Sequence, residues 1–168
     1  MLILSPETLE NISKEKKDEN REFSELVKGM PSARFDEAVK KWADHYTSRI
    51  DCTMCANCCR TIHVGISKKE ICSLASACDT DTNEFEKEEV DLEPDGTGGY
   101  LSTKPCKFLE GSLCSIYSQR PSSCRSYPGL DGSHLKYRMR RIMDEYSICP
   151  IVYHTIEKVK KELNSDSC

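Results

Sequence analysis

The sequence predicts an α+β fold: a small, cysteine-rich domain stapled by metal, with N-terminal helices, a short β-hairpin and a C-terminal helix. Three observations predict it. Apolar residues follow helical spacing towards both ends of the chain, short apolar segments flank a glycine turn in the middle, and eight cysteines form one bipartite pattern. The 168 residues suffice for one domain, but only 38% of them are hydrophobic. We therefore expect a modest core that metal helps to hold together.

The N-terminal third predicts two helices. Residues 7–28 predict a largely solvated helix, because the charged and polar run 13–22 interrupts its apolar face, and Gly29 and Pro31 predict its end. Residues 32–49 predict a better-defined helix, whose apolar stripe comprises Phe35, Ala38, Val39, Trp42 and Tyr46. We expect residues 1–50 to form a helical extension and residues 51–165 to form the cysteine-cluster domain.

Shorter elements are predicted between the two halves of the cysteine pattern. Residues 61–66 alternate as a strand does, and Ser67 with Glu70 forms a capping box that opens a short helix. Residues 79–95 contain nine acidic residues and one lysine, which predicts an exposed connection. A calcium loop is the sharper alternative for this run. It is disfavoured because the acidic residues do not follow the EF-hand order and no glutamate closes the loop.

The second half predicts extended segments over 100–103 and 106–109, followed by a turn at Gly111 and a return strand over 113–117. Arg120 and Pro121 begin a short turn or helix that carries Cys124. Residues 135–146 fit either period, and we favour a strand at their start. A final helix starts at Pro150, with Lys158, Lys160 and Lys161 suited to the negative end of its dipole and one apolar face made of Val152, Ile156, Val159 and Leu163.

The cysteine pattern predicts a thiolate metal centre. It opens as C-x-x-C-x-x-C-C, and such a run keeps its sulfurs close together, as zinc or iron requires. The predicted ligands are Cys52, Cys55, Cys58, Cys59, Cys106, Cys114, Cys124 and Cys149. Eight thiols exceed the need of one tetrahedral ion. They suit two zinc ions, an iron–sulfur cluster with spare thiols, or a polynuclear iron site.

Individual positions within the pattern differ in what they predict. Cys59 follows Cys58 directly and points elsewhere along the backbone, so one of the two can serve a second ion, a bridging position or the core. Cys106 and Cys114 flank the predicted hairpin turn, where cross-strand neighbours lie close. Cys149 precedes the proline-led helix, and we expect the helix N-terminus to lower its thiol pKa and favour the thiolate.

These motifs resemble the YkgJ-type cysteine-cluster family. The resemblance rests on the C-x-x-C-x-x-C-C run and on the linked motifs Pro105-Cys106-x-Phe108-Leu109, Cys114-Ser115-Ile116-Tyr117, Arg120-Pro121-x-x-Cys124-Arg125, Tyr127-Pro128 and Cys149-Pro150. It covers residues 52–153 and implies a domain that chelates zinc or iron. Flagellin lysine-N-methylase is similar in its cysteine motifs. Asn57 departs from the family, whose members often have glycine there, although asparagine tolerates a left-handed backbone.

Composition restricts the remaining function classes. The net charge of −4 argues against a broadly basic nucleic-acid binder, and no stretch is long and apolar enough to cross a membrane. With no signal sequence recognised, eleven cysteines predict reduced thiols and a cytoplasmic protein. A disulfide framework is therefore disfavoured. A solvated face is the favoured reading of the basic run Arg138, Arg140 and Arg141.

Several residues near the pattern have two interpretations. His63 is the histidine closest to the first motif and is either a nitrogen ligand or, as we favour, a hydrogen-bonded strand residue. Arg120 and Arg125 flank Cys124 and can tune the centre by hydrogen bonding. Cys72, Cys78 and Cys168 lie outside the pattern and are predicted to pack, to be free thiols or to be incidental.

The sequence leaves three functions open. The first is a metal-binding protein whose centre, of zinc, iron or an iron–sulfur cluster, is structural or a store. The second is an iron-dependent protein-modifying enzyme, by analogy with flagellin methylation. The third is a zinc-stabilised interaction module. No catalytic triad, phosphate loop or dinucleotide fingerprint is present in the sequence, and no protein partner or substrate can be named from it.

Overall fold

The computed structural model describes residues 2 and 4–165, and the chain divides into two compact units. The helical unit contains the segment that ends at Cys55 and the segment that starts at Pro128; the mixed unit contains Ala56–Tyr127. The expected α+β class is confirmed, with helices towards both ends of the chain and small antiparallel sheets between them. None of the described helices combines the length and the apolar character that a membrane span requires.

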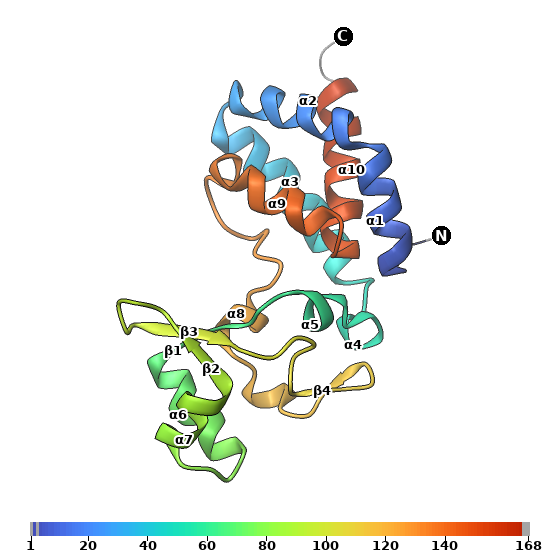
Figure 1. Cartoon of the computed structure of the whole chain (residues 1–168). Helices are drawn as coiled ribbons and strands as arrows, with labels where there is room; N and C mark the ends of the chain where they lie inside the picture. Colours follow the sequence, from blue (N-terminus) through green and yellow to red (C-terminus); the bar gives the residue numbers. More distant parts are fainter. Residues whose placement is uncertain (1, 3, 166–168) are drawn as a thin grey trace. The chain divides into compact units, whose positions relative to one another are not determined.

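The helical unit joins helices from the two ends of the chain, blue and red in Figure 1. Its elements are α1 (Pro6–Glu15), α2 (Lys17–Lys28), α3 (Ser32–Thr47), α4 (Cys52–Cys55), the 3₁₀ turn η2 (Leu135–Arg138), α9 (Met139–Tyr146) and α10 (Pro150–Ser165). The predicted stripe of α10 is confirmed, because Val152, Ile156, Val159 and Leu163 are all buried.

Helices α3 and α10 pack antiparallel. The indole nitrogen of Trp42 donates to Glu162 at 2.7 Å, and the ring of Tyr46, one turn further along α3, stacks on His154 with centroids 5.1 Å apart. Later residues of α3 therefore contact earlier residues of α10. This arrangement places the C-terminal end of α3 beside the N-terminal end of α10.

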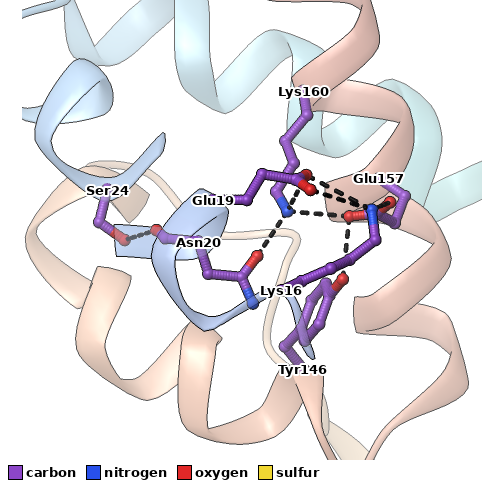
Figure 2. Close-up of polar contacts among 7 residues, drawn as sticks. All are labelled: Lys16, Glu19, Asn20, Ser24, Tyr146, Glu157 and Lys160. Atoms are coloured by element: carbon purple, nitrogen blue, oxygen red, sulfur yellow. Dashed lines mark hydrogen bonds and ion pairs between the residues drawn. The ribbon is translucent and has the colours of Figure 1, made fainter. Parts of the chain in front are cut away.

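A buried ion cluster ties α2 to α10. Lys160 is 4% exposed, and its ammonium donates to Glu19 at 2.8 Å, to Glu157 at 2.9 Å and to the side-chain oxygen of Asn20. Glu157 also accepts from Lys16 at 2.6 Å and from the hydroxyl of Tyr146 at 2.9 Å, as Figure 2 shows. The two lysines and two glutamates balance in charge, which is the condition under which a buried charge is tolerated.

Three expectations for this unit require correction. Residues 7–28 form two helices that meet at Lys16, not one. The strand favoured at the start of residues 135–146 is wrong, because that segment forms η2 and α9. The segment is helical because a helix, unlike a strand, buries the four apolar residues of the stripe on one face, namely Leu135, Met139, Ile142 and Tyr146. Lys160 was assigned to the helix dipole, but its ammonium lies in the ion cluster.

The mixed unit packs short helices against small sheets. Its elements are α5 (Asn57–Thr61), β1 (Gly65–Ser67), α6 (Lys68–Ala77), α7 (Thr82–Glu89), β2 (Val90–Leu92), β3 (Gly98–Leu101), β4 (Leu109–Glu110), β5 (Leu113–Cys114), the 3₁₀ turn η1 (Tyr117–Gln119) and α8 (Ser122–Arg125). The first sheet has the antiparallel order β1-β3-β2. Glycine is required in its central strand, because a Cβ at Gly98 would lie 2.3 Å from the carbonyl oxygen of Ile66.

Local signals in the mixed unit were predicted well, and one segment was not. The capping box of Ser67 and Glu70 opens α6, and β4 and β5 form the predicted hairpin, with Gly111 in the left-handed region. The strand expected over 61–66 is shorter and later, as β1. The acidic run 79–95 is more than an exposed connection, because it contains α7 and β2 and buries Phe85 and Val90.

Candidate metal centre

The eight cysteines of the pattern are divided between the two units. The boundary falls inside the C-x-x-C-x-x-C-C run, between Cys55 and Ala56. The three-cysteine group of the helical unit consists of Cys52, Cys55 and Cys149. The five-cysteine group of the mixed unit consists of Cys58, Cys59, Cys106, Cys114 and Cys124.

The three-cysteine group lies where α3 ends and α10 begins. Cys52 and Cys55 are the first and last residues of α4, three positions apart and so on the same helical face. Asp51 fixes the start of that turn by accepting from the backbone N–H of Thr53 at 2.8 Å and from its hydroxyl at 2.7 Å. Cys149 directly precedes α10. Negative charge on Cys52 and Cys55 acts to raise the pKa of Cys149, as expected for neighbouring thiols.

Cys149 corrects the expectation of a lowered thiol pKa. It is 6% exposed, and burial raises its pKa to about 12. The backbone N–H groups of Val152 and Ile151 act in the predicted, lowering direction but do not overcome burial. The free thiol is therefore protonated at neutral pH, and metal binding there must release a proton.

The five-cysteine group begins with an unusual backbone. Ala56 has φ 51° and ψ 16°, in the left-handed region, and α5 starts at the next residue. The left-handed position of the loop is thus Ala56 and not Asn57, which is helical and buried. The bend turns the chain between the two C-x-x-C steps, so that Cys58 and Cys59 follow on a separate helix from Cys55.

Cys58 and Cys59 lie together although they are consecutive. Their sulfurs are 3.9 Å apart, so the expectation that Cys59 points elsewhere is wrong. A hydrogen bond from Cys58, together with the positive charges of Arg60 and Arg120, lowers the pKa of Cys59 to about 6. Arg120 thus influences a cysteine of the motif by charge, while its Nε donates to the carbonyl of Tyr117 at 3.1 Å.

The other cysteines of this group lie on three further segments, one of which contacts Cys59 through the backbone. The N–H of Cys106 donates to the carbonyl of Cys59 at 2.8 Å, and Cys114 lies in the β4–β5 hairpin opposite Leu109. Cys124 is on α8. Burial raises the pKa of Cys106 and raises that of Cys124 to about 11, and negative charge on Cys59, Cys106 and Cys114 adds to the shift at Cys124. The mixed unit therefore gathers thiols from four segments.

Glu70 positions Cys124, a role that the sequence analysis did not assign. One oxygen of its carboxylate accepts from the N–H and hydroxyl of Ser67 at 2.9 and 2.8 Å, and the other accepts from the N–H of Ser122 at 2.6 Å. The hydroxyl of Ser123 donates to the carbonyl of Gly65 at 2.7 Å. These bonds fix the start of α8 against α6 and β1. The capping box in the sequence indicated the contact between Glu70 and Ser67. It gave no indication of the contact between Glu70 and Ser122.

A family model for CxxCxxCC, described as a "putative zinc- or iron-chelating domain", matches residues 51–150. The chain belongs to the CxxCxxCC family. No curated protein and no solved structure matches the chain. The matched span begins just before Cys52 and ends just after Cys149, so it contains both cysteine groups.

The cysteine sulfurs of this CxxCxxCC chain are ligands that suit a soft metal, but the side chains do not surround a common point. Among the described residues, no three His, Cys, Asp or Glu side chains are gathered as a bound ion requires. The residues fit through the nature of their atoms, since thiolate sulfur is the ligand that zinc and iron–sulfur centres share. Zinc or iron bound by these cysteines would supply a positive charge that stabilises their thiolates.

The residues with two interpretations are placed as follows. The ring Nδ1 of His63 lies 3.3 Å from the carbonyl oxygen of Leu101 in β3, which fits the interpretation of His63 as a hydrogen-bonded residue. Cys72 is exposed on α6, and Cys78 packs partly buried against the core of the mixed unit. Cys168 lies outside the described residues. The side chain of Arg125 donates to the backbone carbonyl of Arg120.

Proposed function

We propose that this CxxCxxCC chain binds zinc or iron through two separate groups of cysteines, one in each unit. The single observation that carries the proposal is the division of the eight cysteines at Cys55 and Ala56, which leaves three thiols in one unit and five in the other. Membership of a family described by zinc or iron chelation supports the choice of metals.

The five-cysteine group holds enough donors for a closed centre. A structural zinc site uses four protein ligands in a tetrahedron, and iron–sulfur clusters commonly use the same number of cysteines. Cys106, Cys114 and Cys124 come from separate elements. The fourth ligand comes from the Cys58–Cys59 pair, whose sulfurs are only 3.9 Å apart. The lowered pKa of Cys59 favours its thiolate, the form in which a cysteine binds metal.

The proposal implies a reducing compartment, and we infer the cytoplasm. Metal ligation requires the eight thiols to remain reduced, which oxidising compartments do not allow without protection. Burial of Cys149 and Cys124 raises their thiol pKa values, so the metal must displace their protons, and binding is then coupled to the stability of each unit.

Anaerobic purification followed by metal and acid-labile sulfide analysis tests this function. We expect zinc or iron at about two centres per chain, and sulfide only if a centre is an iron–sulfur cluster. Brown protein with visible sulfur-to-iron bands would assign iron, and colourless protein with zinc would assign zinc. Replacing the exposed Cys72 by serine is the matched control and should leave the metal content unchanged. Protein that is folded and free of bound metal contradicts the proposal.

A further inference from the structure

We propose that Tyr117, Arg120 and Arg125 of the mixed unit form a surface that binds a carboxylate-bearing peptide segment of a partner protein. These three residues are called the arginine surface below. The sequence analysis assigned Arg120 and Arg125 to the tuning of the cysteine centre, but their contacts leave most of their N–H donors for another ligand. The inference requires no bound metal and so goes beyond the proposed function.

Tyr117 holds the guanidinium of Arg120 in one orientation. The guanidinium carbon lies 3.6 Å from the centroid of the Tyr117 ring, and Nε of Arg120 donates to the carbonyl oxygen of Tyr117 at 3.1 Å. Stacking on a ring uses no N–H group, so the two Nη groups keep the forked geometry that pairs with a carboxylate through two parallel hydrogen bonds. A guanidinium that is already oriented loses less side-chain freedom when it binds a ligand.

Arg125 adds a second positive charge beside Arg120. Its Nη1 donates to the backbone carbonyl of Arg120, which leaves its other N–H donors available. Among the described residues, no carboxylate lies within ion-pairing distance of Arg120 or Arg125. Glu70 reaches the same helix, α8, but its two oxygens accept from Ser67 and Ser122. Two neighbouring guanidiniums without a carboxylate are suited to bind one from another molecule.

The surroundings favour a short acidic peptide over a nucleic acid. The chain has a net charge of −4, and the run 79–95 of the same unit contains nine acidic residues, so an extended polyanion would be repelled. A peptide needs to bring only a few carboxylates to the arginines. Tyr117 is 48% exposed, and Leu113 in the preceding hairpin is 58% exposed. These apolar surfaces offer a peptide further contact area, and tyrosine and arginine are the residues that protein interfaces favour.

Fluorescence anisotropy with a defined probe tests the inference. The full chain, purified anaerobically, is titrated into a short rhodamine-labelled peptide of glutamate, leucine and serine, and separately into a counterpart with glutamine in place of each glutamate. We expect saturable binding of the glutamate peptide alone. Arg120→Met and Arg125→Met should each weaken this binding roughly tenfold, because each removes hydrogen bonds to a charged group. Arg120→Lys keeps the charge but loses the fork, so it should also bind more weakly than the parent.

The control variant separates the arginine surface from the net charge. Lys69 is an exposed cation of α6 in the same unit, and Lys69→Met changes the net charge by the same amount as either arginine variant. It should leave the affinity for the glutamate peptide unchanged. Arg120 is partly buried, so its replacement can disturb folding, whereas Arg125 is exposed and tests the surface without that risk. Circular dichroism confirms the folding of each variant before the titration.

Three outcomes overturn the inference. Absence of binding by the full chain means that the arginines act only on Cys59, or that a carboxylate of the helical unit already occupies them. Equal binding of the glutamine peptide, or equal weakening by Lys69→Met, reduces the effect to nonspecific contact or net charge. Tighter binding of a single-stranded oligonucleotide than of the glutamate peptide assigns the surface to nucleic acid instead. The metal content of the chain is measured separately, so failure of this inference is distinct from failure of the proposed function.

Discussion

The carboxylate of Glu70 accepts a hydrogen bond from the backbone N–H of Ser122 at 2.6 Å, across 52 positions of sequence. The same side chain caps α6 through Ser67. One residue thus fixes two helix starts, and the second of these helices carries Cys124. The position of a predicted metal ligand depends on a side chain that is not itself a predicted ligand.

Replacing Glu70 by alanine should therefore weaken metal retention as well as stability. We expect a loss on the order of 1–2 kcal/mol in the free energy of unfolding, because a helix cap and a second hydrogen bond to a charged group disappear. Chelator competition should show faster metal loss from the variant. Glu88→Ala removes an exposed carboxylate of α7 and is the control. Equal metal retention by both variants would mean that Glu70 does not position Cys124.

The Glu70 contact also predicts a pH dependence. Burial acts to raise the pKa of this carboxyl, but hydrogen bonds from Ser122 and Ser67 outweigh it and lower the pKa from 4.5 to about 2. Its stabilising contribution is therefore complete above pH 4.5 and is lost as the pH falls towards 2. Urea unfolding of the parent and of Glu70→Ala should give stability curves that converge in this acidic range. Curves that stay parallel would contradict the assignment.

Lys160→Met should destabilise the helical unit. The substitution leaves Glu157 and Asn20 without their buried ammonium partner, which costs on the order of 3 kcal/mol. Lys161→Met is the matched control, because its side chain is exposed on the next position of α10 and its loss should cost less than about 0.5 kcal/mol. Urea denaturation followed by far-ultraviolet circular dichroism measures both. Similar midpoints for the two variants would show that the ion cluster contributes little.

Ala56→Gly should stabilise the mixed unit. The left-handed conformation at φ 51° is strained for a residue with a Cβ but not for glycine. Glycine is also more flexible in the unfolded chain, which offsets part of the benefit, so we expect the free energy of unfolding to rise by about 0.5–1 kcal/mol. Ala77→Gly at the end of α6 is the control and should destabilise the unit, since that backbone is helical. A loss of stability in Ala56→Gly would contradict the left-handed assignment.

Cys114→Ser should reduce stability only when metal is present. If Cys114 is a ligand, its loss removes part of the metal-coupled folding energy, so the thermal midpoint of the metal-loaded protein should fall towards that of chelator-treated protein. Cys72→Ser, at an exposed position outside the pattern, should leave both midpoints unchanged. A Cys114→Ser protein that remains fully folded and metal-loaded would remove Cys114 from the ligand set.

Local signals in the sequence predicted local structure. The capping box at Ser67 and the glycine turn at Gly111 involve residues a few positions apart, the apolar face after Pro150 repeats every three or four residues, and each is present. The segment from Leu135 failed because its apolar residues satisfy both a strand and a helix, and only packing decides between them. The acidic run 79–95 was predicted to be exposed because its many charges outnumber Phe85 and Val90, which are buried.

The spacing of the cysteines in the sequence does not predict how they divide between the two units. Cys55 and Cys58 are as close in sequence as Cys52 and Cys55, yet a unit boundary separates the first pair and not the second. That boundary follows from the return of Pro128 and later residues to pack with α3, which is a tertiary event. The pKa of Cys149 illustrates the same limit, because the helix start was predictable and the burial that outweighs it was not.

Native mass spectrometry of metal-loaded variants tests the central claim most directly. The claim is that two cysteine groups bind metal independently. We predict that Cys149→Ser loses the metal of the helical unit alone, that Cys106→Ser combined with Cys124→Ser loses the metal of the mixed unit alone, and that the triple variant loses both. Loss of all metal from Cys149→Ser, in protein that remains folded, would contradict the claim and would indicate one centre shared by all the ligands.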